Sequence, residues 1–141
     1  MVTLADVRRI TPHADGAEFT EYRVPSHPVY YQETEDPFWH KHVFKPDKTR
    51  RVLKQRPGGD CFFLGSEGCV LPKDARPLVC RLYPFDYNAD GILPVTYPGC
   101  PLELLQPGQN LITELGMRLE DAQPIHAQLY REICETEPLE A

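Results

Sequence analysis

The sequence predicts a small, irregular α+β domain with a short antiparallel sheet and helices at its N- and C-terminal ends. Apolar residues recur at helical spacing only near the two ends of the chain, whereas short runs typical of strands, separated by turn formers, occupy the middle. The 141 residues include 15 prolines against 9 glycines, a composition that favours short elements and long loops. We expect residues 1–141 to form a single domain, because this length suits one hydrophobic core.

The first expected element is a short amphipathic helix over residues 3–10. Thr3 is a suitable N-cap, and Asp6 stands at the third position after it, as in a capping box. Residues 15–22 are expected to form a second helical piece. Residues 24–40 are rich in proline and aromatic side chains without clear periodicity, so we expect an irregular segment there.

The middle of the chain predicts short strands that pair into a small antiparallel sheet. The expected strands are residues 42–44, 51–54, 61–64 and 69–71. Turn-forming sequences at residues 57–60 and 65–68 precede and follow the third of these strands. This arrangement places Cys61 and Cys69 near the ends of adjacent segments, so that both thiols can face one point.

The remaining elements alternate between helix and strand. Residues 74–82 predict a turn of helix that carries Cys80, and residues 92–97 predict a strand that runs into a tight turn at Cys100. Residues 102–141 form a helical C-terminal extension, expected to be a hairpin of two helices divided at Pro124.

Charge and hydropathy exclude some classes of function. The formal net charge of -6 argues against general affinity for nucleic acid phosphates, which depends on a lysine- and arginine-rich surface. No apolar run is long enough to cross a bilayer, so we expect no membrane partner. The first residues also lack the layout of a signal peptide, and we expect a cytoplasmic protein.

The cysteines are the main candidates for chemistry. Five cysteines in a reducing compartment argue against disulfides and leave metal binding, catalysis or simple burial as alternatives. Four of them follow the pattern C-x7-C-x10-C-x19-C, at Cys61, Cys69, Cys80 and Cys100. Zinc and iron–sulfur clusters both accept four thiolates, so this set predicts a shared metal site. The fifth, Cys134, falls in a helical apolar stripe, and we expect it to be buried.

Other side chains were weighed as parts of this site. Lys73, Arg76 and Arg81 surround Cys80 in the sequence and would balance the negative charge of a metal held by four thiolates, although such residues are often only solvated. His40 and His42 would share one face of a strand and are possible additional ligands for zinc or iron. A polar surface is the other interpretation of this pair.

Several motifs together resemble a known family. These are Cys61-Phe62-Phe63-Leu64, Gly68-Cys69-Val70-Leu71, Arg76-Pro77-Leu78-Val79-Cys80-Arg81-Leu82-Tyr83-Pro84-Phe85 and Gly99-Cys100-Pro101. The succession resembles the YkgJ-type cysteine-cluster proteins, also described as the CxxCxxCC zinc- or iron-chelating domain, over about residues 1–101. The resemblance implies chelation of zinc, of iron or of an iron–sulfur cluster by Cys61, Cys69, Cys80 and Cys100. It also implies accompanying basic residues at Arg76 and Arg81.

One departure from the family pattern leaves alternatives open. The cysteines that give the family its name stand before the helix that residues 2–10 resemble, and this sequence begins at Met1 without them. Either an upstream segment has been lost, or this member retains a single four-cysteine site. Some relatives are linked to lysine N-methylation of flagellin, so a metal-dependent enzyme is one alternative function. A metal-free interaction module is the other.

Overall fold

The computed structural model describes residues 1–24, 42–96 and 105–135, with the side chains of residues 94–96 excepted, and has an α+β fold. Its strands form three separate two-stranded antiparallel sheets, pairing β1 with β2, β3 with β4 and β5 with β6. The strands are β1 (Thr20–Arg23), β2 (Arg50–Leu53), β3 (Leu64–Gly65), β4 (Gly68–Cys69), β5 (Phe85–Asn88) and β6 (Gly91–Thr96). The predicted fold class is confirmed, but the expected small sheet is divided into hairpin-like pairs.

The helices lie at both ends of the chain and in its centre. They are α1 (Leu4–Ile10), η1 (Thr11–His13), η3 (Lys73–Ala75), α3 (Leu78–Leu82), α4 (Leu111–Glu114) and α5 (Leu119–Glu135), where η denotes a 3₁₀ helix. Among the described residues, none of these helices is long and apolar enough to cross a membrane.

The N-terminal helix begins where the sequence predicts. The Thr3 hydroxyl accepts a hydrogen bond from the Asp6 N–H, and the Asp6 carboxylate accepts one from the Thr3 N–H, each at 2.9 Å. This reciprocal capping box satisfies N–H groups that have no partner inside the helix. Both residues are buried, so the cap also lies in the interior of the protein.

The prediction of a second helical piece over residues 15–22 is wrong. Asp15 and Gly16 have φ angles of 49° and 78°, a left-handed pair that cannot continue a right-handed helix. The chain then extends into β1, in which Tyr22 lies opposite Arg51 of β2. Pairing with β2 supplies the backbone hydrogen bonds that an isolated helix would have had to make internally.

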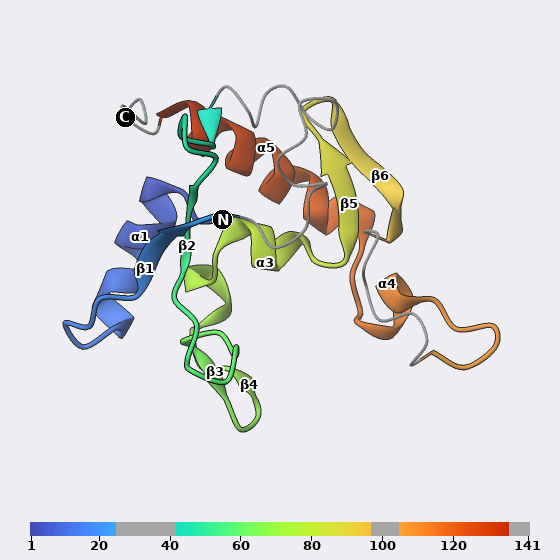
Figure 1. Cartoon of the computed structure of the whole chain (residues 1–141). Helices are drawn as coiled ribbons and strands as arrows, with labels where there is room; N and C mark the ends of the chain where they lie inside the picture. Colours follow the sequence, from blue (N-terminus) through green and yellow to red (C-terminus); the bar gives the residue numbers. More distant parts are fainter. Residues whose placement is uncertain (25–41, 97–104, 136–141) are drawn as a thin grey trace.

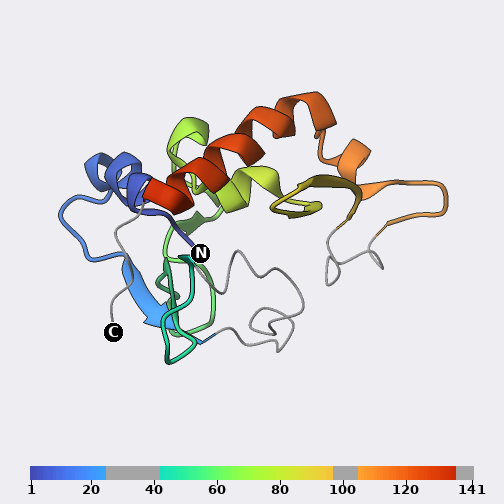
Figure 2. The same ribbon diagram turned by 90° about the horizontal axis from the view of Figure 1, so that it is seen from above.

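The main core lies between α3, α5 and the β5–β6 pair. In Figure 1, α5 lies above α3 and passes behind β5, and in the view from above in Figure 2 it runs beside α3. Leu78 and Leu82 of α3 and Leu129 of α5 are fully buried at this interface. The core consists of Val43, Phe44, Leu78, Leu82, Phe85, Ala122, Leu129 and Ile133.

A smaller apolar cluster connects α1 to the segment that precedes α3. Its buried members are Ile10, Ala14, Phe19, Phe63 and Leu71, and Cys61 packs against it. The rings of Phe19 and Phe63 meet edge to face at 5.6 Å between centroids. This cluster therefore positions the chain on either side of Cys61.

Several predicted boundaries in the middle of the chain need correction. Residues 42–44 do not form a strand, and Val43 and Phe44 are instead buried in the main core. The helix expected over residues 74–82 is interrupted, because Pro77 adopts an extended conformation between η3 and α3. Strand β5, which pairs with the expected strand at residues 92–97, was missed by the sequence analysis.

The C-terminal region also differs from the expected hairpin. Pro124 lies inside α5 instead of dividing two helices. Its missing N–H removes one hydrogen bond near the start of a helix of 17 residues, which packing of Ala122 and Leu129 against α3 offsets. The segment 24–40 and the turn at Cys100 were also predicted, and apart from Val24 they lie outside the described residues.

Candidate metal centre

Cys61 lies at the end of a tight loop that begins at β2. It pairs with Gln55 in an antiparallel bridge, and the Phe62 N–H donates to the Lys54 carbonyl at 2.9 Å. The loop between them turns at Gly59, whose φ of 94° favours glycine. Cys61 itself is half-buried. The predicted turn before Cys61 therefore exists, although Cys61 does not belong to a continuous strand.

Cys69 lies in the smallest of the described sheets. It pairs with Leu64 across the β3–β4 hairpin, and Gly65 pairs with Gly68 next to the turn. A further bond from the Val70 N–H to the Phe63 carbonyl, at 2.9 Å, extends this pairing beyond the two strands. Cys69 is exposed. The return of the chain after residues 65–68 is as predicted, and the hairpin places Cys69 near the Cys61 segment.

Cys80 is the third residue of α3. The two leucines at the ends of this helix, Leu78 and Leu82, are fully buried toward α5. Cys80 lies between them in sequence and keeps exposed surface on the other side of the helix, although neighbouring atoms crowd its thiol enough to desolvate it in part. The amino group of Met1 lies close enough to Cys80 for the charges of the two groups to interact. Figure 1 shows the N-terminus beside α3.

The three described candidate ligands, Cys61, Cys69 and Cys80, influence one another electrostatically. Desolvation raises the pKa of the Cys80 thiol, and the negative charges of Cys61 and Cys69 raise this pKa further, while the Met1 amino group opposes them. Thiolates influence one another in this way only when they are close in space. Three segments that are distant in the sequence thus place their thiols within range of one another's charges, without grouping them as metal ligands in the described part of the chain.

The chemistry of these donors suits a soft metal ion. Without a cation, each additional thiolate disfavours ionisation of Cys80, whereas a bound metal would favour the thiolate form of all three. Thiolates are preferred ligands of zinc and of iron–sulfur clusters. In the described part of the chain, however, no three histidine, cysteine, aspartate or glutamate side chains are already grouped as metal ligands.

The other predicted site residues have different outcomes. Cys100 and His40 lie outside the described residues. His42 lines a small cavity whose lining also includes Met1, Thr3 and Arg51. None of the three described candidate cysteine ligands is among the residues that line that cavity.

Cys134 is exposed on α5, and its predicted burial is wrong. The buried stripe of α5 includes Ala122, Leu129 and Ile133. Cys134 follows Ile133 directly and is rotated by about 100° from it around the helix axis. The sequence analysis placed it on the wrong face.

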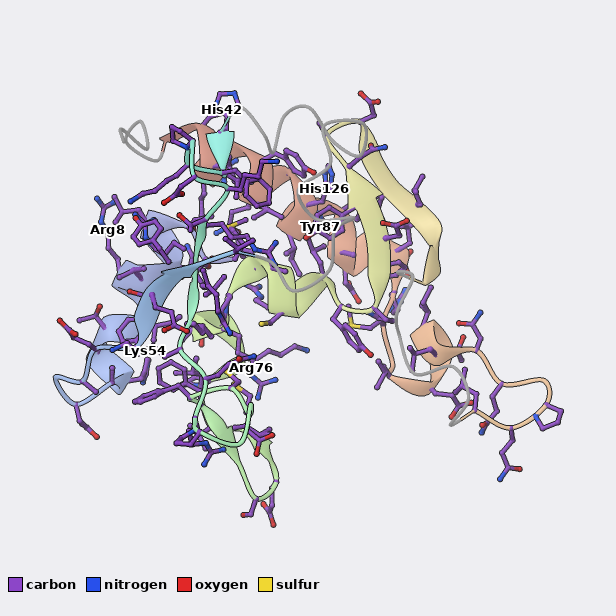
Figure 3. All side chains as sticks on the ribbon, in the orientation of Figure 1. Arg8, His42, Lys54, Arg76, Tyr87 and His126 are labelled. Atoms are coloured by element: carbon purple, nitrogen blue, oxygen red, sulfur yellow. The ribbon has the colours of Figure 1, made fainter. Side chains whose placement is uncertain are left out.

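The basic residues near Cys80 have more specific roles than the sequence indicates. Arg76 donates from Nε to the Leu71 carbonyl at 3.1 Å and from Nη2 to the Cys69 carbonyl at 3.3 Å. Figure 3 shows Arg76 between α3 and the β3–β4 hairpin. Arg81 is half-buried in α3, and its Nε is a buried donor without a hydrogen-bond partner in the described structure. Lys73 is exposed.

The sequence analysis missed the role of Asp6 near this site. Its carboxylate Oδ1 accepts a hydrogen bond from the N–H of Leu78, the first residue of α3, at 3.2 Å. The capping motif identified Asp6 as a local residue, but no pattern in the sequence indicates a contact with a residue so distant along the chain.

Comparison of the chain with models of known protein families, with curated proteins and with solved structures found no match. The resemblance to the YkgJ-type proteins, and the metal site that it implies, therefore stay predictions.

Proposed function

We propose that this protein binds zinc or iron, the latter as a single ion or in an iron–sulfur cluster, through the thiolates of Cys61, Cys69, Cys80 and Cys100. The observation that carries the proposal is the shared neighbourhood of Cys61, Cys69 and Cys80. Desolvation raises the Cys80 pKa most, and the charges of the other two cysteines add to it. A metal would remove this mutual repulsion by binding the thiolates together.

Metal binding would be structural in character. Two of the three described candidate ligands lie on short, weakly paired segments, Cys61 at an isolated bridge and Cys69 in a two-residue strand. Shared coordination would connect these segments to α3 and contribute its binding free energy to folding. Four thiolates complete a tetrahedral zinc site and leave no open position for a substrate, which favours a binding or structural role over open-site zinc catalysis.

Elemental analysis of protein purified without oxygen tests this proposal. We expect stoichiometric zinc or iron, with visible absorption if an iron–sulfur cluster is present. Serine substitution of Cys61, Cys69, Cys80 or Cys100 should each lower the metal content, because a serine hydroxyl is a poor replacement for a thiolate. Cys134→Ser is the matched control, since this exposed cysteine lies on α5. A protein that takes up no zinc or iron, with all five thiols reduced, would contradict the proposal.

A further inference from the structure

The segment that connects Cys69 to Cys80 is fixed at both ends by side chains that bind backbone atoms. It runs from β4 through η3 to the first turn of α3. At its β4 end, the Arg76 guanidinium donates to the carbonyls of Cys69 and Leu71, at 3.3 and 3.1 Å. Arg76 directly precedes the Pro77 N-cap of α3. One side chain therefore connects the backbone of Cys69 to the start of the helix that carries Cys80.

At the α3 end, the partner is Asp6. Helix α3 begins after Pro77 and has no side-chain cap of its own, so its first N–H, from Leu78, needs an acceptor from elsewhere. The Asp6 carboxylate, which is fully buried, supplies that acceptor at 3.2 Å. The other oxygen, Oδ2, accepts from the Thr3 N–H at 2.9 Å, while Arg9 Nη2 donates to Oδ1, the oxygen that also accepts from Leu78, at 2.5 Å. Asp6 is thus held in place independently of α3.

The Arg9 guanidinium extends this arrangement to α5. Its Nη1 and Nη2 each donate to the Glu132 carboxylate at 2.8 Å, and the Thr3 hydroxyl donates to the same carboxylate at 2.8 Å. Helices α1, α3 and α5 therefore meet at one buried polar network, and only Asp6 in that network touches the backbone of α3 among the contacts described.

We propose that Asp6 and Arg76 are positioning residues that set the separation of Cys80 from Cys69 before metal binds. This inference rests on the proposed function of the cysteines. Neither side chain is a ligand in this proposal; each acts on the backbone that carries a ligand. Preset spacing lowers the ordering free energy required when the thiolates come together, and removal of either contact makes binding weaker.

The proposal gives Arg76 a role that differs from charge compensation. A lysine at this position would keep the positive charge but lose the planar group with which Arg76 reaches two carbonyls at once. Arg76→Lys therefore separates the two roles. Lys73→Ala is the matched control, because it removes an exposed positive charge from η3, within the same connecting segment, without a described contact to β4.

Titration with Co²⁺ under reducing, oxygen-free conditions provides the measurement. Thiolate coordination gives a charge-transfer absorption, and competition with a chromophoric chelator gives the affinity. We expect Arg76→Lys to weaken Co²⁺ binding about 10–100-fold, as does Arg76→Ala, whereas Lys73→Ala binds like the wild type. Wild-type affinity in Arg76→Lys would overturn the positioning role of Arg76.

The contribution of Asp6 is tested against a second member of the same network. Asp6→Asn alters the carboxylate that receives the Leu78 N–H, whereas Glu132→Gln weakens the network without a described contact to α3. With both variants at a temperature where each is folded, we expect weaker Co²⁺ binding in Asp6→Asn alone. Equal losses of affinity in the two variants would overturn the role of Asp6.

The same titration separates this inference from the proposed function. If wild-type protein shows no thiolate-to-cobalt absorption, the metal site itself is refuted, and the positioning roles fall with it. If the wild type binds Co²⁺ and the Asp6 and Arg76 variants bind it with wild-type affinity, the metal site stands and only the positioning roles are refuted.

Discussion

The helical core and the cysteine-bearing region of this protein are held together by different interactions. In the core, Leu78, Leu82 and Leu129 bring together α3 and α5 with no exposed surface. Around the cysteines, the β3–β4 hairpin has strands of two residues each, and Val70 next to Cys69 is 67% exposed. Apolar burial accounts for the first region. In the second, buried Phe63 and Leu71 flank the β3–β4 hairpin, while the hairpin itself is held by backbone hydrogen bonds and the Arg76 side chain.

This difference indicates which region a bound metal would stabilise most. A two-residue hairpin with little buried apolar surface opens locally at low free energy, without unfolding of the packed helices. Helix α3 belongs to both regions, because it buries leucines against α5 and carries Cys80 on its other side. A metal bound to Cys80 and Cys69 would therefore connect the less stable region to the more stable one.

The largest effect is expected from truncation in the helical core. Leu129→Ala removes a fully buried side chain between α5 and α3 and should lower the free energy of unfolding by about 2–5 kcal/mol. Val70→Ala, in the hairpin, should change it by no more than about 0.5 kcal/mol, because Val70 is mostly exposed. Urea unfolding followed by circular dichroism measures both. Equal losses would show that the two regions do not differ in packing.

A smaller effect is expected from the polar contact between the N-terminal helix and α5. Desolvation raises the pKa of Glu132, but hydrogen bonds from Arg9, Gln128 and Thr3 outweigh it and leave this pKa below the ordinary value of 4.5. A carboxylate whose pKa is lowered in the folded state stabilises the protein at pH values above the pKa that the carboxylate has in the unfolded state. That contribution is lost as the pH falls through the folded-state pKa.

Glu132→Gln should therefore be less stable than the wild type at neutral pH by about 1.5–3 kcal/mol, the range for a hydrogen bond to a charged group. The difference between the two proteins should shrink as the pH falls below 4.5. Unfolding curves at several pH values from neutral to acidic measure this difference. A difference that stays constant down to the most acidic pH would contradict the assigned role of the Glu132 charge.

Predictions from the sequence are correct where the interacting residues are close along the chain and wrong where they are far apart. The capping box of α1 was predicted correctly because Thr3 and Asp6 are neighbours in the sequence. Residues 20–22 were assigned to a helix because their partner strand, β2, begins only at Arg50, so nothing local indicated the pairing. The turn glycines before and between Cys61 and Cys69 were readable for the same reason as the cap.

For the candidate site, the residue types were readable but the contacts were not. Arg76 was predicted to matter for its charge, whereas its hydrogen bonds go to the backbone carbonyls of Cys69 and Leu71. Every residue has a backbone carbonyl, so the sequence does not show which ones Arg76 contacts. The hydrogen bond from the Leu78 N–H to Asp6 joins residues that are 72 positions apart in the sequence. Backbone acceptors and long-range partners carry no sequence signature, and so the shape of the site could not be predicted.

The smallest effect on global stability is expected from Gly68→Ala, and it tests the contrast between the two regions most directly. Gly68 has a φ of 104°, where an alanine is strained even though no atom lies within 4 Å of the added Cβ. The strain, about 1–3 kcal/mol, exceeds the free energy that we expect the hairpin to need for local opening, so the hairpin opens and the helical core stays folded. The free energy of global unfolding in urea should then shift by less than about 0.5 kcal/mol, while hydrogen exchange at the Val70 amide becomes faster.

Gly116→Ala, also at a positive φ but beside α4, is the control for strain without an effect at Val70. If Gly68→Ala lowered global stability by the full strain energy, the hairpin would unfold only together with the core, and a metal at Cys69 would then have no separate region to stabilise.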